Sequence, residues 1–290
     1  MTAIDLRAKR SWRSTKSQLV TGLMIAAVVA IFIPLAAVLW SLVERGGGIV
    51  VAAFPDFFTE EIPQFSRRAG PGMGPAVVGT LLATGAATVM AVPLGVLGAV
   101  YLHEYGGKDR FARVVRFMAT VMTGVPSIVM GLFIYLMWTI RFGFSAFGGA
   151  LALACLMLPV VIGSAEQMLR LVPNHLREAS YALGATRSRT ILTVVLPAAI
   201  PGIVSGCLLA IARAAGETAP LLFAVGAAKA FNTSVFHEAN TALSVQIFGN
   251  AMDVPAAQAR AWGAALTLVL LTFLLTLSAR LITGRFAMKR

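Results

Sequence analysis

An arginine and a glutamate stand four residues apart inside an apolar stretch of this 290-residue sequence, in the segment Ile211-Ala-Arg-Ala-Ala-Gly-Glu-Thr-Ala-Pro220. The planar guanidinium of Arg213 suits bidentate recognition of an anionic oxygen pair, such as that of a phosphate. Ionisable side chains are costly inside a membrane and by default mark a functional path or site there. Arg213, Glu217 and the adjoining Thr218 are therefore predicted to line a path for an anion.

The spacing of this pair allows a second interpretation. Residues four apart share one helix face, so Arg213 and Glu217 are expected within salt-bridge reach of each other. The alternative is a buried ion pair that fixes helix register and never touches a substrate. Because the pair is formally neutral, a strong anion site would need further donors, which we expect from a second chain.

A polar segment with its own helix signature runs from Pro173 to Pro201 between two apolar stretches. Pro173 and Asn174 are start signals, Leu176, Ala179 and Leu183 fall on one face, and Gly184 stands where a helix should stop. A helix of about ten residues is not stable alone, so this one is predicted to dock on a partner.

The composition defines the elements that must position these residues. The chain is 58% hydrophobic and 12% charged, with a mean hydropathy of +0.82, which is typical of an all-α polytopic membrane protein. The net charge of +12 comes in short clusters beside apolar runs, which favours membrane topology over nucleic-acid binding. The two cysteines (Cys155 and Cys207) lie in apolar runs and the three histidines are scattered, so no metal site, cofactor or disulfide is predicted.

Six transmembrane helices are predicted, separated by polar segments. They cover 19–42, 76–102, a stretch from the basic segment 103–116 to about Trp138, then 147–165, 198–225 and 261–282. The segment 1–18 precedes the first helix, 43–75 and 226–260 are outer loops, 76–283 is the five-helix core with the loop 166–197 inside it, and 284–290 is a basic tail. Proline lies in or beside most of the helices, either where they line a path or where they simply kink for packing.

The basic residues predict which loops face the cytoplasm. Arg213 lies within a helix, and all but six of the other lysines and arginines fall on one side of the six-helix topology. The six on the opposite side are Arg45, Arg67, Arg68, Arg141, Lys229 and Arg260. By the positive-inside rule both termini and the loop 166–197 are expected in the cytoplasm.

The loop resembles a known motif at fixed spacing. Glu178-Ala179-Ser180, Gly184, Val194 and Leu196-Pro197 are similar to the EAA loop of ABC importer permeases, with Ser180 and Val194 replacing an alanine and an isoleucine. The resemblance implies the type I importer permease fold and a separate ATPase docked on this helix. The residues it would use are Glu178, Ala179, Ser180, Leu183, Gly184 and Ala185. The alternative is an ordinary amphipathic helix on the membrane surface.

A narrower resemblance covers about residues 76–225. The stretch Arg213 to Leu222, with Gly-Glu-Thr-Ala-Pro at its centre, is similar to the PstA-type permeases of phosphate importers, as are Gly79-Thr-Leu81, Val92-Pro-Leu-Gly-Val96, Tyr101-Leu-His-Glu-Tyr105 and Gly124-Val-Pro-Ser127. It implies import of inorganic phosphate, with membrane lipid around the chain and three kinds of partner. These are a sister permease that completes a heterodimer, two copies of an ATP-binding subunit, and an extracytoplasmic phosphate-binding protein.

Other functional classes fit less well. The phosphate-binding loop Gly-x-x-x-x-Gly-Lys-[Ser/Thr] is absent, so the chain is not expected to hydrolyse ATP or to be an enzyme. A membrane hydrolase would need a nucleophile with a base, or a metal pair, and neither is found. A secondary transporter would show inverted repeats and leave the loop without a role. A permease for molybdate or sulfate stays open as an alternative.

Overall fold

The computed structural model describes residues 12–67, 70–107 and 109–287, and this part of the chain forms helices and loops without a strand. Five helical segments are long and apolar enough to cross a membrane: Lys16–Ala52, Gly74–Tyr105, Ala146–Arg170, Arg187–Ala215 and Pro255–Leu281. A sixth crossing is made if the bent pair Arg110–Thr123 and Ser127–Phe142 counts as one span. The all-α, six-helix prediction is thus confirmed with the bent pair included.

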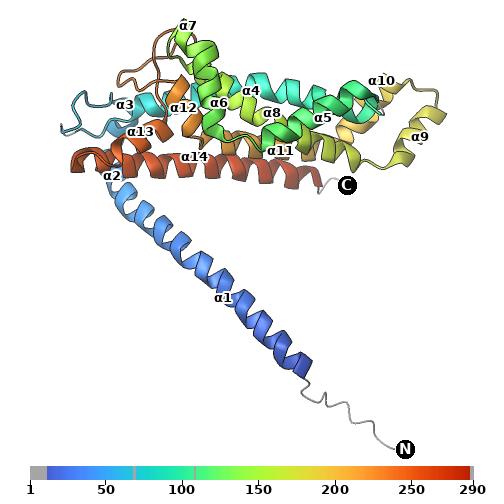
Figure 1. Cartoon of the computed structure of the whole chain (residues 1–290), viewed down its shortest axis with the longest axis horizontal. Coiled ribbons are helices and arrows are strands. Elements are labelled where there is room, and N and C mark those ends of the chain that lie inside the picture. Colours follow the sequence, from blue (N-terminus) through green and yellow to red (C-terminus); the bar gives the residue numbers. More distant parts are fainter. Residues whose placement is uncertain (1–11, 68–69, 108, 288–290) are drawn as a thin grey trace, which may run out of the picture.

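The core forms where α4 (Gly74–Val100) lies along α8 (Ala146–Arg170), the most buried candidate span (Figure 1). One side of α4 carries a small residue at every fourth position, and all six are buried: Gly79, Ala83, Ala87, Ala91, Gly95 and Ala99. Residues four apart share a helix face, and small side chains there let two backbones approach closely in a membrane. This stripe explains why α4 and α8 are the most closely paired helices.

Two further long helices complete the bundle. The helix α11 (Leu196–Ala215) packs on α8 and on α14 (Pro255–Ala287). At one end of the bundle lie α9 (Asn174–Ala182), α10 (Arg187–Thr190) and the last turns of α14 (Figure 1). The opposite end carries α3 (Asp56–Thr59), α7 (Ile140–Phe142) and α13 (Leu243–Asn250).

The first helix stands apart from the bundle. It continues from α1 (Trp12–Ser41) through a π-type turn, η1 (Leu42–Gly46), into α2 (Gly47–Ala52), so it outlasts the predicted end at residue 42 by ten residues. Its apolar stretch is not buried by the rest of the chain, and α1 leaves the bundle obliquely (Figure 1). Only η1 and α2 pack against α14.

The third predicted span is bent rather than straight. The helix α5 (Arg110–Thr123) meets the segment Ser127–Phe142 at an angle of 107°. That segment consists of α6 (Ser127–Ile134), η3 (Tyr135–Thr139) and α7. Pro126 ends the first helix because proline lacks an N–H and its ring pushes Val125 out of the helical region. The third predicted span, which was expected to reach about Trp138 without a break, is therefore interrupted at Pro126.

Two more boundaries differ from the prediction. The fifth span was expected to run to residue 225, but α11 stops at Ala215 and α12 (Ala219–Ala224) begins after a break. Pro220 would clash with the carbonyl of Gly216 in a continuous helix, which explains the break. The predicted outer loop 226–260 contains α13, whose first four residues are buried. Most of the predicted N-terminal segment 1–18 and the end of the basic tail lie outside the described residues.

Candidate functional site

Arg213 occupies the last turn of α11, just before the helix breaks. The N–H groups of Gly216 and Glu217 donate to the carbonyls of Arg213 and Ala214, at 3.1 Å each, and the chain then turns into α12. Glu217 therefore lies beyond the helix end and not on the same helical face, as the spacing had suggested. The predicted ion pair nevertheless forms, with 3.8 Å between Arg213 Nε and Glu217 Oε1.

The two partners of this pair differ in exposure. The Arg213 side chain is 74% exposed on this chain, and that of Glu217 is 22% exposed. A register-fixing pair with both groups buried is therefore not what the chain forms on its own. Arg213 presents its guanidinium at the surface, where another chain or a ligand can reach it.

The helix α13 supports the backbone at Glu217. Ser244 Oγ donates to the Glu217 carbonyl at 2.9 Å, and the Leu243 N–H donates to Thr80 Oγ1 on α4 at the same distance. Thr218 precedes α12 and is half-buried, and its carbonyl accepts from the Leu222 N–H. These bonds fix the break in position relative to α4, so Glu217 and Thr218 stand on a supported turn.

The space inside this chain beside the pair is small. The cavity lined by Arg213, Glu217 and residues of α8 measures about 10 Å³, which holds about one water. An anion the size of phosphate does not fit in this cavity, so the accessible side of Arg213 is its exposed side.

The second predicted site, the helix of the polar loop, forms as α9 with the predicted stop. Gly184 has φ +80°, and its N–H donates to the Tyr181 carbonyl at 2.9 Å. The next N–H, of Ala185, donates to the Ser180 carbonyl at 3.2 Å. These two bonds form a Schellman motif, which satisfies the last carbonyls of a helix through a left-handed residue.

Replacing Gly184 with alanine is expected to loosen α9. A Cβ there meets nothing within 4 Å, so the cost of about 1–2 kcal/mol is that of a left-handed backbone alone. Amide exchange of residues 174–182 should accelerate by roughly five- to thirtyfold. Gly85, also free of neighbours within 4 Å but in a helical conformation, is the matched control, and Gly85→Ala should not accelerate exchange. Equal exchange in both variants would contradict the role of the Gly184 turn.

The exposed surface of α9 is the part that a partner could contact. Glu178, Ala179 and Gly184 are exposed, and Leu183 is 89% exposed. Ser180 is buried and Ala185 is half-buried. The six predicted coupling residues thus divide into four that face outward and two that face the chain itself.

Ser180, one of the two departures from the family motif, has a bonding partner in the structure. Its Oγ lies 2.8 Å from Oγ1 of Thr190, and both residues are buried. The bond ties α9 to α10, which leads directly into α11 through η4 (Ile191–Val195). A movement of α9 is in this way connected to the helix that carries Arg213.

Sequence reasoning missed the residue that anchors the other side of α9. Arg177 donates to Glu104 Oε1 at 2.9 Å, to the Leu169 carbonyl at 3.1 Å and to the Val172 carbonyl at 2.6 Å. The Arg177 and Glu104 side chains are only 12% and 6% exposed. Glu104 belongs to η2 (Tyr101–Tyr105), the last turn of the α4 segment. The one feature of the sequence that could have indicated this contact is the single acidic residue in the segment Tyr101-Leu-His-Glu-Tyr105.

Breaking this pair from one side is expected to cost about 3–5 kcal/mol, because it leaves a buried charge without a partner. Arg177→Met should therefore expose the segment 171–190 to protease, whereas the double variant with Glu104→Gln should recover much of the resistance. Arg170 pairs with Glu166 at 3.5 Å but is 71% exposed, so Arg170→Met serves as the control and should change little. Equal sensitivity of Arg177→Met and Arg170→Met would contradict the anchor.

The fold of known transporters matches this chain at low sequence identity. A bacterial ABC transporter that imports the acidic polysaccharide alginate superposes with a TM-score of 0.62 at 14% identity, over 96% of this chain and 99% of that chain. The inward-facing MetNI methionine ABC transporter superposes with a TM-score of 0.58 at 19% identity, over 73% and 92%. Such likeness shows the importer permease fold.

Sequence comparison shows the family. The profile of the binding-protein-dependent transport system inner membrane component matches residues 91–288. Phosphate transport system permease protein PstA 1 of Mycobacterium tuberculosis (strain ATCC 25618 / H37Rv) is 44% identical over 274 residues, which are 93% of this chain and 88% of that protein. The PstA of Yersinia pestis is 40% identical over 282 residues, or 96% and 94%. The chain therefore belongs to the binding-protein-dependent transport system inner membrane components and, within them, to the PstA-type permeases.

Proposed function

We propose that this chain is the transmembrane permease subunit of an ATP-driven importer of inorganic phosphate in the bacterial cytoplasmic membrane. The observation that carries the proposal is the 40–44% identity, along nearly the whole chain, with proteins named as phosphate transport system permeases. The site fits an anion, since an exposed guanidinium stands at the break of a membrane helix. The chain itself performs no chemistry in this account, and ATP is hydrolysed by a separate subunit.

The path for phosphate runs past Arg213 at the surface between this chain and a sister permease. Arg213 binds an anionic oxygen pair through its fork of N–H donors. Glu217 neutralises the guanidinium when no anion is present, and Thr218 on the adjoining turn lies close to the path. The sister permease supplies the further donors that a neutral pair lacks.

Movement is transmitted through α9. Two copies of an ATP-binding subunit serve the heterodimer, and one of them docks on the exposed Glu178, Ala179, Leu183 and Gly184. The anchors behind this surface carry its displacement to α4 through Arg177 and to α11 through Ser180. An extracytoplasmic binding protein delivers phosphate at the opposite end of the bundle, and both termini face the cytoplasm with α9.

Selectivity in cells tests the substrate assignment. Cells that lack their own phosphate uptake systems, given this chain with its partner subunits, should accumulate labelled phosphate from dilute medium. A large excess of sulfate or molybdate should leave that uptake unchanged. If either oxyanion competes as well as unlabelled phosphate does, the chain is still a permease but phosphate is not its specific substrate.

A further inference from the structure

The junction between the first helix and the rest of the chain contains a polar group that the transport account does not use. Arg45 in η1 lies over the ring of Trp262 in α14, with 5.2 Å between the guanidinium carbon and the ring centroid. The two backbones approach closely one residue further on, where a Cβ on Gly46 would lie 2.6 Å from the Trp262 carbonyl oxygen. The position of Arg45 is therefore set by backbone packing as well as by its own side chain.

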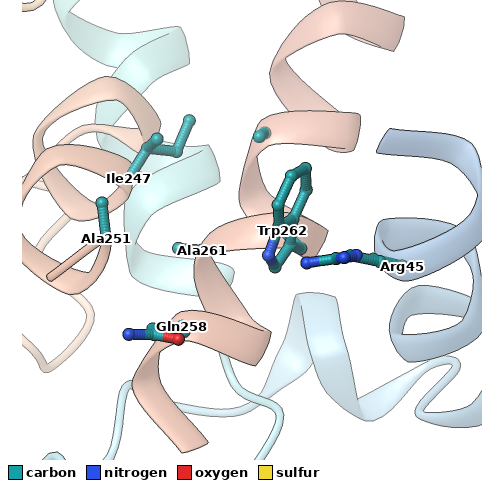
Figure 2. A pocket seen from close by; sticks show the side chains of 7 residues that line it. Arg45, Ile247, Ala251, Gln258, Ala261 and Trp262 are labelled. Carbon is teal, nitrogen blue, oxygen red and sulfur yellow. The ribbon is translucent and has the colours of Figure 1, made fainter. Parts of the chain in front are cut away.

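Beside this contact is an open cleft of about 360 Å³ between η1, α13 and α14. Its polar side-chain groups are the Arg45 guanidinium, the Gln258 amide and the indole N–H of Trp262, and the rest of the lining is apolar, including Ile247 and Ala251. Figure 2 shows Arg45 reaching toward the Trp262 ring, with Gln258 below and Ile247 and Ala251 beyond. A cleft with one cationic group on apolar walls suits an amphipathic anion.

No carboxylate of the described residues pairs with the charge of Arg45 in this cleft. Glu44 precedes Arg45 on η1 but does not line the cleft. Asp253 lies close in sequence to Gln258, but its carboxylate accepts from Ser66 and from the Val254 N–H, bonds that lower its pKa, and it does not line the cleft either.

The cleft lies at the depth of lipid headgroups. Counting from Leu19, the first apolar residue of the predicted span, an untilted helix needs about 20 residues to cross a core about 30 Å thick. The helix α1 is oblique to the bundle (Figure 1), and a tilted helix needs more residues to cross, which moves this boundary from about residue 39 toward Arg45. Counting back from Arg280 in α14, the same thickness ends near residue 260, next to Trp262. Tryptophan is enriched at this interface, so two independent counts place the contact at one boundary.

An apolar surface continues from the cleft into the membrane. On the side of α14 that carries Trp262, the side chains of Val269, Leu270 and Phe273 are two-fifths exposed or more. Among the described residues, nothing buries the apolar stretch of the first helix, which diverges from α14 (Figure 1). A headgroup held by Arg45 would have room for its acyl chains along this face.

We propose that the Arg45–Trp262 cleft binds the phosphodiester headgroup of an anionic phospholipid from the outer leaflet. Arg45 donates to the phosphate oxygens, Gln258 contacts the polar headgroup, and Trp262 packs on the glycerol and upper acyl region. An anionic headgroup is preferred over a zwitterionic one. The ammonium group of a zwitterionic headgroup would stand beside the positive guanidinium of Arg45 and would be repelled by it. The proposal is independent of the transported substrate, and its choice of the outer leaflet rests on the proposed orientation with both termini in the cytoplasm.

The test is native mass spectrometry of the full-length chain, purified with its accompanying subunits from nanodiscs that contain phosphatidylglycerol or phosphatidylcholine. Wild type should retain phosphatidylglycerol, and Arg45→Gln should lower its retention roughly fivefold, whereas Arg45→Lys should keep most of it. Arg141 is another exposed arginine predicted on the same side of the membrane as Arg45, and Arg141→Gln should leave the retention of phosphatidylglycerol unchanged. Equal retention in Arg45→Gln and wild type, or equal retention of phosphatidylcholine, would overturn the proposal.

A second measurement keeps the proposal testable if Arg45→Gln does not fold. A photoreactive residue at the exposed Ala251 position of otherwise wild-type protein should crosslink to phosphatidylglycerol. Crosslinking only to another protein subunit would show that protein fills the cleft and would overturn the proposal. Displacement of the lipid by millimolar inorganic phosphate would overturn it too, since the site would then recognise free phosphate.

Discussion

Arg213→Ala is expected to lower phosphate uptake by about 10- to 100-fold without lowering the amount of chain in the membrane. Hydrogen bonds to a charged group contribute about 1.5–3 kcal/mol, and each 1.4 kcal/mol corresponds to a tenfold change. The Arg213 side chain is 74% exposed and the Glu217 side chain that it pairs with is 22% exposed, so the pair is screened by solvent on the arginine side and its loss should not prevent insertion of the chain. Initial rates of labelled phosphate uptake, normalised to the chain present by immunoblot, measure the effect.

Two further variants separate anion binding from simple truncation. Arg213→Lys keeps the charge but loses the planar fork, so its uptake should fall between those of wild type and Arg213→Ala. Leu209 lies one turn earlier on α11 and is 60% exposed. Leu209→Ala therefore controls for the loss of an exposed side chain, and this variant should retain most uptake. Full uptake by Arg213→Ala would remove this residue from the path.

Glu178→Lys is expected to abolish most ATP-dependent uptake while the chain still inserts into the membrane. Glu178 is exposed on α9, so reversing its charge leaves the fold of this chain intact. At an interface, like charges brought together cost several kcal/mol, which corresponds to a loss of at least about tenfold in docking of the ATPase. Co-purification of the ATPase with this chain and uptake in the presence of ATP measure the two effects separately.

The matched control for this variant lies on the same helix. His175 is exposed one turn before Glu178. His175→Lys therefore adds a positive charge to the same helix without removing the negative charge of Glu178. It should bind the ATPase and support uptake to within about twofold of wild type. If Glu178→Lys behaves like His175→Lys in both measurements, α9 is not the ATPase contact.

Local signals in the sequence were sufficient for the elements that depend on local chemistry. Pro173, Asn174 and Gly184 predicted the bounds of α9 because start signals and a left-handed stop act within one turn of the chain. The apolar runs predicted the long helices because crossing hydrocarbon requires a minimum length. The Arg213–Glu217 pair followed from a spacing of four, although the helix ends between the two residues.

Features that depend on packing between distant segments were not predictable in the same way. The bond between Arg177 and Glu104 joins residues 73 apart in the chain, and nothing in either segment alone specifies the other. The helix α13 was taken for a loop because it is short and follows polar residues, and it is held by a bond to Thr80 on α4. The exposure of Arg213 depends on which side of α11 the neighbouring helices cover.

Two of the helix boundaries that differ from the prediction have a local cause, which is a proline. Pro220 follows Gly216 by four residues, which is the spacing at which a proline ring blocks the carbonyl of the earlier turn. Pro126 acts in the same way between α5 and α6. Long apolar character favoured continuous helices in both places, but a membrane protein can satisfy a broken helix with its neighbours, as Ser244 does at Glu217.

The most direct test of the account is uptake of labelled phosphate into vesicles that hold this chain with its sister permease, the ATPase and the binding protein. The account predicts uptake that requires ATP, continues in the presence of sulfate or molybdate, and falls when Arg213 is replaced by alanine. Transport of phosphate at the same rate without ATP would contradict it, because α9 would then have no ATPase to serve.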